Sequence, residues 1–124
     1  MDDCIFCKIL NGEIPAKKIY EDEKIYAFLD ISPQGKGHTL VVPKKHSSDI
    51  FEVEEELLCE VLKIVKKLAI HIKEKLNPEG ISIVQNNGEI AGQTVFHFHM
   101  HIIPRYIEKE EYDIDEVYRI LKLN

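Results

Sequence analysis

The sequence predicts a single α+β domain, residues 1–124, built on a five-stranded antiparallel sheet with one long helix and short helices near both ends. Five short segments rich in β-branched and aromatic residues alternate with turn residues, as strands do. One long segment has apolar residues at intervals of three and four, which is typical of an amphipathic helix. Most connections between the predicted strands are too short for the crossovers that parallel strands need, so we expect an antiparallel sheet.

The first predicted element is a short helix over 4–11, with Asp2 and Asp3 before it as candidate caps. Cys4 and Cys7 have the spacing Cys-x-x-Cys, which fits a redox dithiol, half of a zinc site, or two buried small residues. A redox motif is expected beside a βαβ unit, and none follows in the sequence. The zinc-site and buried interpretations both remain open on the cysteine pair alone.

Three strands are predicted next. Segments 18–21 and 25–30 form a hairpin around a polar turn, and 38–43 resumes after a loop that contains Pro and Gly. Asp30 ends the second strand beside apolar residues, where a carboxylate either caps the following turn or holds the paired hydroxyl groups of a sugar. His46, which follows the third strand, is a candidate metal ligand or an exposed side chain.

A long amphipathic helix is predicted over 53–76, with Glu residues crowding its start and Lys residues near its end, as the helix dipole favours. Asn77 and Pro78 end it. A strand over 81–86 and a turn-rich loop follow, and the last predicted strand comes next. The segment 113–116 then offers a capping box for a final short helix.

The last predicted strand, 93–105, carries His97, His99 and His101 at two-residue intervals, a set that we call the histidine row. Side chains alternate along a strand, so the row is expected to line one face. The other, buried face would carry Phe96, Phe98, Met100 and Ile102. Neighbouring histidines would lie about 7 Å apart and the outer pair about 13 Å apart. Two neighbours can share a metal ion and all three cannot without strain, so we expect a row divided between two tasks.

The middle of the row suits chemistry at phosphorus. A neutral imidazole is a good nucleophile there and its adduct is labile to water, which makes His99 the candidate nucleophile. His101 could donate a proton to a departing group. Gln93 and Thr94, just upstream, are donors suited to a phosphate. Two alternatives are a metal-dependent hydrolase that uses the row and three solvated histidines on an exposed sheet face.

The composition excludes several other classes of function. Apolar residues make up 44% of the chain and charged residues 31%, as in ordinary globular proteins. A net charge of -6 argues against nucleic-acid binding, which calls for an excess of Lys and Arg on one face. No apolar run approaches the roughly 20 residues that cross a membrane, and the N-terminus does not resemble a signal peptide. We therefore expect a cytoplasmic protein, whose cysteines, Cys4, Cys7 and Cys59, are thiols or ligands.

The segment from Gln93 to Ile103 resembles the signature of the histidine triad (HIT) family, His-φ-His-φ-His-φ-φ, in which φ is apolar. The likeness is closest to the nucleotide-binding Hint-like branch. It extends to four further segments, namely 4–9, 28–33, 37–46 and 86–88, and so covers most of the chain up to Arg105. Residues 106–124 remain as a C-terminal extension, which lacks the tryptophan found at the end of the animal Hint-like proteins.

The resemblance implies a homodimeric, HIT-like α+β fold that binds purine nucleotides. It implies hydrolysis at the α-phosphorus of a nucleoside phosphoramidate or related nucleotidyl substrate, with His99 transiently nucleotidylated and His101 assisting at the phosphate and leaving group. Alternatives are a non-catalytic nucleotide-binding adaptor and a dinucleoside polyphosphate hydrolase. The implied substrate contacts are Ile5, Phe6, Ile9, Phe28, Leu29 and Ile31 for the base, Asp30 for the ribose, Asn86, Gln93 and Thr94 at the phosphate, and His38 beside the pocket.

The resemblance also bears on the zinc question. Microbial members that are similar to this chain carry a structural zinc on two N-terminal cysteines, a histidine after a Lys-Lys pair and the first histidine of the triad. The corresponding residues here are Cys4, Cys7, His46 and His97. Such a set makes a closed tetrahedral site, which is structural because no position is open to substrate. Outside this zinc set, Thr94 departs from the sequence pattern of the Hint-like branch, since many members of the branch have serine at that position.

Overall fold

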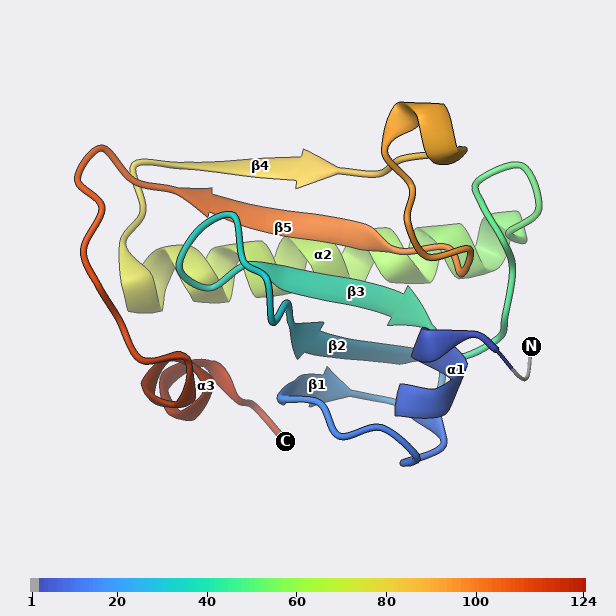
Figure 1. Ribbon diagram of the computed structural model, residues 1–124, viewed down its shortest axis with the longest axis horizontal. Coiled ribbons are helices and arrows are strands. Elements are labelled where there is room, and N and C mark those ends of the chain that lie inside the picture. Colours follow the sequence, from blue (N-terminus) through green and yellow to red (C-terminus); the bar gives the residue numbers. More distant parts are fainter. Residues whose placement is uncertain (1–2) are drawn as a thin grey trace.

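The computed structural model describes residues 3–124 and shows a five-stranded sheet with one long helix across one face (Figure 1). The strands are β1 (Lys18–Glu21), β2 (Ile25–Leu29), β3 (Thr39–Pro43), β4 (Gly80–Val84) and β5 (Met100–Arg105). They lie in the order β1-β2-β3-β5-β4, and every neighbouring pair is antiparallel. The helices are α1 (Ile5–Leu10), α2 (Glu55–Leu76) and α3 (Ile114–Leu121), with a short 3-10 helix η1 (Glu89–Ala91). The predicted α+β class and antiparallel sheet are confirmed.

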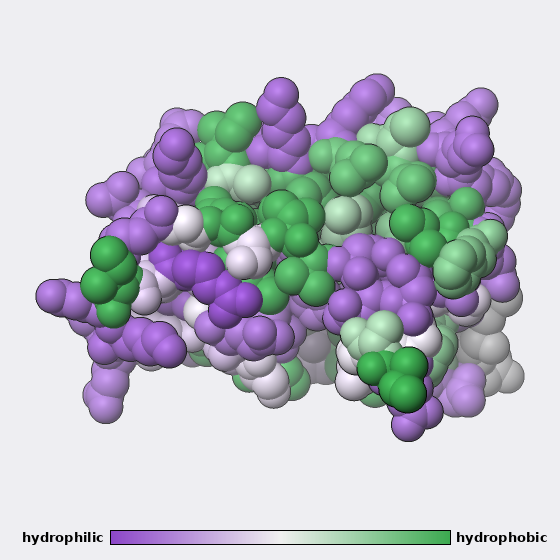
Figure 2. Space-filling view, turned by 90° about the horizontal axis from the view of Figure 1, so that it is seen from above, coloured by the Kyte–Doolittle hydropathy of each residue, from purple (hydrophilic) through white to green (hydrophobic). Residues whose placement is uncertain are grey.

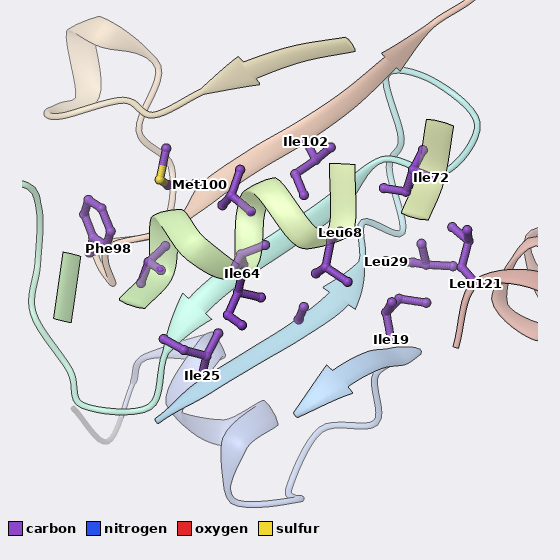
Figure 3. Packing of buried hydrophobic residues seen from close by; sticks show 14 of the residues in the cluster. Ile19, Ile25, Leu29, Ile64, Leu68, Ile72, Phe98, Met100, Ile102 and Leu121 are labelled. Atoms are coloured by element: carbon purple, nitrogen blue, oxygen red, sulfur yellow. The ribbon is translucent and has the colours of Figure 1, made fainter. Parts of the chain in front are cut away.

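The main hydrophobic core lies between α2 and one face of the sheet (Figure 3). α2 buries apolar residues that recur at three and four, among them Ile64, Leu68 and Ile72. These pack with Ile25 of β2 and Ile102 of β5, both fully buried. Complete burial of one such side chain contributes about 1.5–3 kcal/mol. This core therefore fixes α2 against the sheet.

The opposite face of the sheet carries a smaller apolar cluster and α1 (Figure 1). Phe28 of β2 and Leu40 and Val42 of β3 belong to this cluster, together with Phe6 of α1. Leu29, the next residue of β2, belongs to the main core, as the alternation of a strand requires. All five residues of β3 are buried because both faces of the strand are covered. The cysteines of α1 thus lie on the sheet face that faces away from α2.

β5 is shorter than the predicted strand. It begins at Met100, so His97 and His99 lie in the bend that precedes it. The N–H of Phe98 donates to the carbonyl of Ser47 at 2.6 Å, which holds this part of the chain to the loop after β3. The prediction that the whole histidine row lies on a strand is therefore wrong for its first two members.

The predicted burial of the apolar side chains in this segment is confirmed for three of the four, namely Phe98, Met100 and Ile102. It is wrong for Phe96, which is 48% exposed. The alternation of sides holds only inside a strand, and Phe96 precedes the start of β5.

The helix starts also differ from the prediction. Cys4 is the N-cap of α1, and its Sγ accepts a hydrogen bond from the N–H of Cys7 at 3.4 Å. Asp3 is therefore not the cap, and Asp2 lies outside the described residues. α2 begins at Glu55, two residues after the predicted start.

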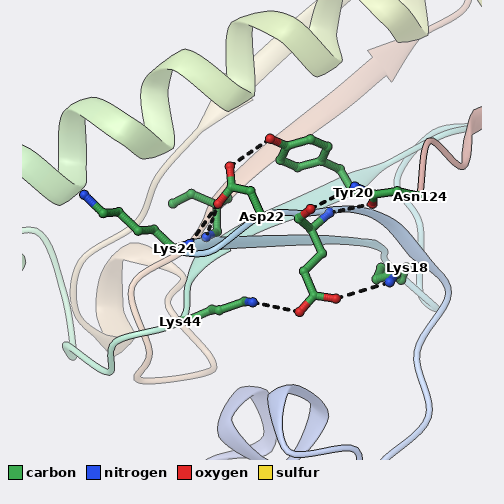
Figure 4. Close-up of polar contacts among 8 residues, drawn as sticks. Lys18, Tyr20, Asp22, Lys24, Lys44 and Asn124 are labelled. Carbon is green, nitrogen blue, oxygen red and sulfur yellow. Dashed lines mark hydrogen bonds and ion pairs between the residues drawn. The ribbon is translucent and has the colours of Figure 1, made fainter.

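The C-terminal extension packs against the β1 side of the molecule. Asp113 caps α3 through its side chain, as predicted. After α3, the N–H of Leu123 donates to the carbonyl of Ile19 at 2.7 Å. The side-chain amide of Asn124 bonds both the N–H and the carbonyl of Glu21, at 2.8 Å each (Figure 4). The end of the chain thus covers the outer edge of β1. Within residues 3–124, no helix has the length and apolar character needed to cross a membrane.

Candidate functional site

Five of the six histidines gather along β3 and the bend before β5. The exception is His71, which belongs to α2. Its Nε2 lies 2.8 Å from the carbonyl of Leu121, and this contact helps to hold α3 against α2. Four of the other five fall into two groups, and His99 lies between these groups. One group contains the two N-terminal cysteines, and the other contains the carboxylate of Asp30.

The first group brings together Cys4, Cys7, His46 and His97. The Nδ1 atom of His97 lies 3.6 Å from the sulfur of each cysteine and 3.2 Å from Nδ1 of His46. The sulfur of Cys7 lies 3.4 Å from the same atom of His46. All four potential ligand atoms are within 4.8 Å of one another. The four residues that the family resemblance implies as metal ligands therefore converge.

The tautomer of His97 fits a metal ligand. Its Nε2 is 2.7 Å from the carbonyl of Pro43, which can only accept, so Nε2 carries the proton and donates. The lone pair then lies on Nδ1, the atom that faces the cysteines and His46. Burial lowers the pKa of His97 to about 4, so the ring is neutral near pH 7. A buried neutral imidazole whose second nitrogen bonds a carbonyl is the usual form of a histidine ligand.

The two thiols favour a cation between them. Burial, and then the hydrogen bond with Cys4, raises the pKa of the Cys7 thiol to about 11, so without a cation Cys7 stays protonated. A bound divalent ion reverses this preference because the thiolate is the ligand form. Two sulfurs and two imidazole nitrogens are the donor set of a tetrahedral structural zinc site. The group fits zinc in its atoms, its tautomer and its charge.

His99 lies between the two groups and has the opposite tautomer. Its Nδ1 is 2.7 Å from the carbonyl of His97 and must donate to it. The free lone pair of His99 is therefore on Nε2. The ring is 7% exposed, and burial lowers its pKa, so the neutral, nucleophilic form is present near pH 7. The ring of Phe6 packs edge-on against it, with centroids 5.0 Å apart and an interplanar angle of 90°.

His38 and His101 form a directed chain of hydrogen bonds. The N–H of Gln34 donates to Nδ1 of His38 at 3.0 Å, so the proton of His38 is on Nε2. Nε2 of His38 lies 2.9 Å from Nδ1 of His101 and donates to it. The proton of His101 must then be on its Nε2. The rings of His99 and His101 have centroids 5.0 Å apart, so a lone pair and an N–H belong to neighbouring rings.

The second group is less suited to a metal than the first. A carboxylate oxygen of Asp30 lies 3.6 Å from Nε2 of His38, and Asp30, His38 and His101 could meet at one ion. Such an ion needs a lone pair on Nε2 of His38, but the N–H of Gln34 already requires the lone pair of that ring at Nδ1. Burial lowers the pKa of both His38 and His101, which keeps the pair neutral. This arrangement favours a hydrogen-bonded pair over a metal-dependent hydrolase.

The residues implied for the nucleotide base are only partly brought together. Phe6 and Phe28 pack edge-on with centroids 5.5 Å apart, and Ile9 packs against the same cluster. Ile5 and Ile31 are exposed, at 50% and 82%. Leu29 is 2% exposed and lies in the main core, on the opposite face of the sheet from Phe28. The structure therefore brings together Phe6, Ile9 and Phe28 and places Leu29 apart from them.

The residues implied for the phosphate differ in how free their side chains are. Gln93 is 1% exposed, and its amide accepts from Gly88 at 2.8 Å and donates to the carbonyls of Ser48 and Val95 at 2.6 and 3.1 Å. Its side chain thus ties three loops together. Thr94 is exposed at a hollow of about 300 Å³ that also reaches Cys4 and His46.

Asn86 is partly buried beside Gly92. A Cβ atom at Gly92 would lie 3.4 Å from the amide nitrogen of Asn86, and the φ of +100° at Gly92 is one that other residues rarely adopt. Gly92 thus allows the loop after η1 to approach Asn86 closely. Its backbone conformation makes it a positioning element of this edge of the site.

Sequence reasoning missed the groups that decide which ring nitrogen carries each proton. These are the N–H of Gln34 and the carbonyls of Pro43 and His97. All three are main-chain groups, and no side-chain pattern marks them. The loop sequence around Gln34, rich in Pro and Gly, indicated only that a turn stands there.

Comparisons with known proteins agree with these observations. A family model described as HIT domain matches residues 11–108. An uncharacterized HIT-like protein of Methanocaldococcus jannaschii is 52% identical over 128 aligned residues, which cover 96% of this chain and 98% of that one. The adenosine 5'-monophosphoramidase hnt1 of Schizosaccharomyces pombe is 45% identical over 111 residues, covering 90% of this chain and 79% of that one.

The crystal structure of a Zn-bound histidine triad family protein from Mycobacterium smegmatis has a TM-score of 0.90 and 37% sequence identity to this chain. The match covers 98% of this chain and 91% of that one. The predicted fold and the predicted family are therefore both confirmed.

Proposed function

The chain belongs to the HIT domain family, and on that premise we propose that it is a nucleotide hydrolase of the phosphoramidase type. It would cleave a bond at the α-phosphorus of a purine nucleotide through a nucleotidyl intermediate on His99. The observation that carries the proposal is the pairing of tautomers: a lone pair on Nε2 of His99 beside an N–H on Nε2 of His101. The activity named for the Schizosaccharomyces pombe relative supports the same class of reaction.

In the first step, Nε2 of His99 attacks the α-phosphorus and the bond from phosphorus to the departing nitrogen breaks. The carbonyl of His97 holds the other nitrogen of the ring protonated and stabilises the positive charge that the adduct places on it. The N–H at Nε2 of His101 donates to the departing group, which takes up a proton from solvent as it leaves as an amine. His38 keeps that N–H in place by donating to the opposite side of the His101 ring.

In the second step, water attacks the same phosphorus and releases His99 with its lone pair restored. The water loses one proton, which balances the proton taken up in the first step. The products are the amine and the nucleoside monophosphate. Burial of His99 limits competing water around the nucleophile while the adduct forms.

The nucleotide would bind along the α1 face of the sheet. The base would pack against the cluster of Phe6, Ile9 and Phe28. Ile5 and Ile31, which are exposed, are the other residues proposed to contact it. Asp30 would hold the ribose hydroxyls, because one of its oxygens is free of the backbone bond that Ser32 makes to the other. The phosphate would meet Thr94 and Asn86, in a loop that Gln93 holds in place.

A zinc ion on Cys4, Cys7, His46 and His97 is part of the proposal. The donor set supports it, and a relative of similar fold is Zn-bound. With four protein ligands the ion has no open position, so its contribution is to hold α1 against the bend before β5. The reaction itself would use only the other part of the site.

We also propose a homodimer formed along β4. This strand is at the edge of the sheet, and Ile83 on it is 44% exposed. On α2, Leu62 and Ile70 are 46% and 49% exposed. A view onto the β4 side shows hydrophobic residues gathered in the middle of this surface (Figure 2). Mass measurement by light scattering tests this directly, since Ile83→Glu should convert a dimer into a monomer.

The test of the proposed activity uses an adenosine phosphoramidate. The variant His99→Asn should lose turnover by at least about 10³-fold, because it removes the nucleophile, while still binding AMP. The matched control is His71→Asn, a histidine outside the site, which should keep full turnover. Turnover in His99→Asn that equals that of the unmodified protein would refute the proposal.

A further inference from the structure

The two parts of the site share the short helix α1. Its cap, Cys4, and its third residue, Cys7, belong to the metal group. Between them in sequence stand Ile5 and Phe6, which the proposed function assigns to the nucleotide base. α1 has six residues, and so short a helix is not stable by itself in water. Its position depends on the contacts made at its ends and on the burial of Phe6.

Phe6 contacts both parts of the site. Its side chain is 5% exposed, and its ring lies edge-on to His97, with centroids 5.9 Å apart, and to His99, with centroids 5.0 Å apart. His97 is a member of the metal group and His99 is the proposed nucleophile. The same aromatic ring therefore packs against a metal-site imidazole and against the imidazole that reacts.

A second link runs through the main chain. The carbonyl of His97 accepts the Nδ1 proton of His99 at 2.7 Å, and Nε2 of the same residue, His97, donates to Pro43 at 2.7 Å. Any movement of His97 that follows a change in the metal group also moves the carbonyl that orients His99. Both links are direct contacts between buried, closely packed residues, so a shift of His97 or Phe6 also shifts His99.

The metal group is also open to solvent on one side. The hollow of about 300 Å³ is lined by Cys4 and His46 together with Thr94, Val95 and Phe96. The hollow thus borders two of the four potential ligands. Thr94, which the proposed function places at the phosphate, borders the same hollow.

We propose that the metal group and the nucleotide site are coupled through Phe6, so that zinc binding raises the affinity for nucleotide and nucleotide binding raises the affinity for zinc. The inference rests on the proposed function for the identity of the nucleotide. Phe6 acts as a positioning residue, which sets α1 and His99 together. By thermodynamic linkage the two affinities change by the same factor, and couplings of this kind are about 5- to 150-fold.

The experiment measures zinc affinity and does not depend on turnover. The protein competes for Zn²⁺ with a chromogenic chelator, with and without saturating AMP. The expected result is a decrease of about 5-fold or more in the dissociation constant for zinc when AMP is present. AMP binding to the zinc-loaded and chelated proteins, followed by calorimetry, should show the same factor. An equal zinc affinity with and without AMP, in a protein that binds AMP, overturns the coupling and leaves the proposed function intact.

A variant separates the contact through Phe6 from a general stabilisation of the fold by both ligands. Phe6→Leu keeps an apolar side chain but loses the ring edges that meet His97 and His99, so its coupling factor should fall well below that of the unmodified protein, and any remaining coupling passes through the main-chain link at His97. Phe51→Leu, at a phenylalanine that is 86% exposed, is the matched control and should keep the full factor. A Phe6→Leu protein that retains the full factor refutes the role of Phe6. Absence of AMP binding in every form refutes the proposed function instead.

Discussion

The two ends of the histidine row differ in the hydrogen-bond partners of their rings, although the three histidines follow one another at equal intervals in the sequence. His97 donates from Nε2 to a carbonyl and turns the lone pair of Nδ1 toward two sulfurs and a second imidazole. His99 donates from Nδ1 and keeps its lone pair on Nε2, and His101 accepts at Nδ1 and keeps a proton on Nε2. At one end lone pairs converge on a point that suits a cation. At the other end a lone pair and a proton stand side by side, as proton and phosphoryl transfer require. The residue type is the same, and the main-chain partner of each ring decides its role.

Because the two ends of the histidine row have different bonding partners, we expect that a substitution at His101 lowers activity and leaves zinc binding unchanged. His101→Ala removes the N–H that meets the departing group, so kcat should fall by about 10²- to 10⁴-fold. The zinc content per chain, measured by atomic emission on the purified variant, should equal that of the unmodified protein. A variant that loses zinc along with activity would show that the two ends are not separate.

A substitution in the metal group should instead weaken zinc binding and lower the stability of the fold. Cys7→Ser removes a sulfur from the four-residue set, so zinc binding should weaken and the free energy of unfolding should fall by about 3 kcal/mol or more. Denaturant unfolding measures this change. Cys59→Ser alters an exposed cysteine of α2 and should change stability by less than about 0.5 kcal/mol. Equal stabilities of the two variants would argue against a metal at this group.

A smaller effect is expected for the residue that orients His101. His38→Phe removes the donor to Nδ1 of His101 and lets its proton occupy either nitrogen, so kcat should fall by about 10-fold, the value of one net hydrogen bond. His38→Gln restores an N–H donor and should recover most of that loss. KM for the phosphoramidate should change less than kcat in both. Equal kcat values for the two variants would show that His38 does not act through this hydrogen bond.

A further effect is expected on stability as a function of pH. Burial lowers the pKa of His38 and of His101 in the folded protein below the ordinary value of 6.5. The unfolded chain therefore binds more protons than the folded chain below about pH 6.5, and acid favours unfolding. The stability from this pair is fully present above pH 6.5 and decreases as the pH falls, by at most about 1.4 kcal/mol per pH unit for each ring. Unfolding of the zinc-loaded protein at pH 7.5 and 5.5 should show a smaller decrease in a His38→Gln, His101→Asn double variant.

Much of the fold follows from the sequence because its signals are local. The spacing of Ile64, Leu68 and Ile72 predicted α2 and the face that it buries, and the capping residue Asp113 predicted the start of α3. The prediction was wrong at Phe96 because strand alternation was applied beyond the point where β5 begins. It placed Leu29 beside Phe28 although neighbours in a strand face opposite sides.

The site follows from the sequence in part. The convergence of Cys4, Cys7, His46 and His97 was expected from the resemblance to the family and is found in the structure. The tautomers were not predictable, since they depend on carbonyl and N–H groups that residues far apart in sequence present after folding. Pro43 and His97 are separated by 54 positions, and no pattern of side chains records that contact.

The division of the histidine row is tested most directly by native mass spectrometry of the zinc-loaded protein during turnover of an adenosine phosphoramidate. We expect chains that carry one zinc ion and one nucleotidyl group at the same time, with the nucleotidyl group on His99. Chains that lose zinc when they gain the nucleotidyl group, or an adduct located on His97, would contradict it.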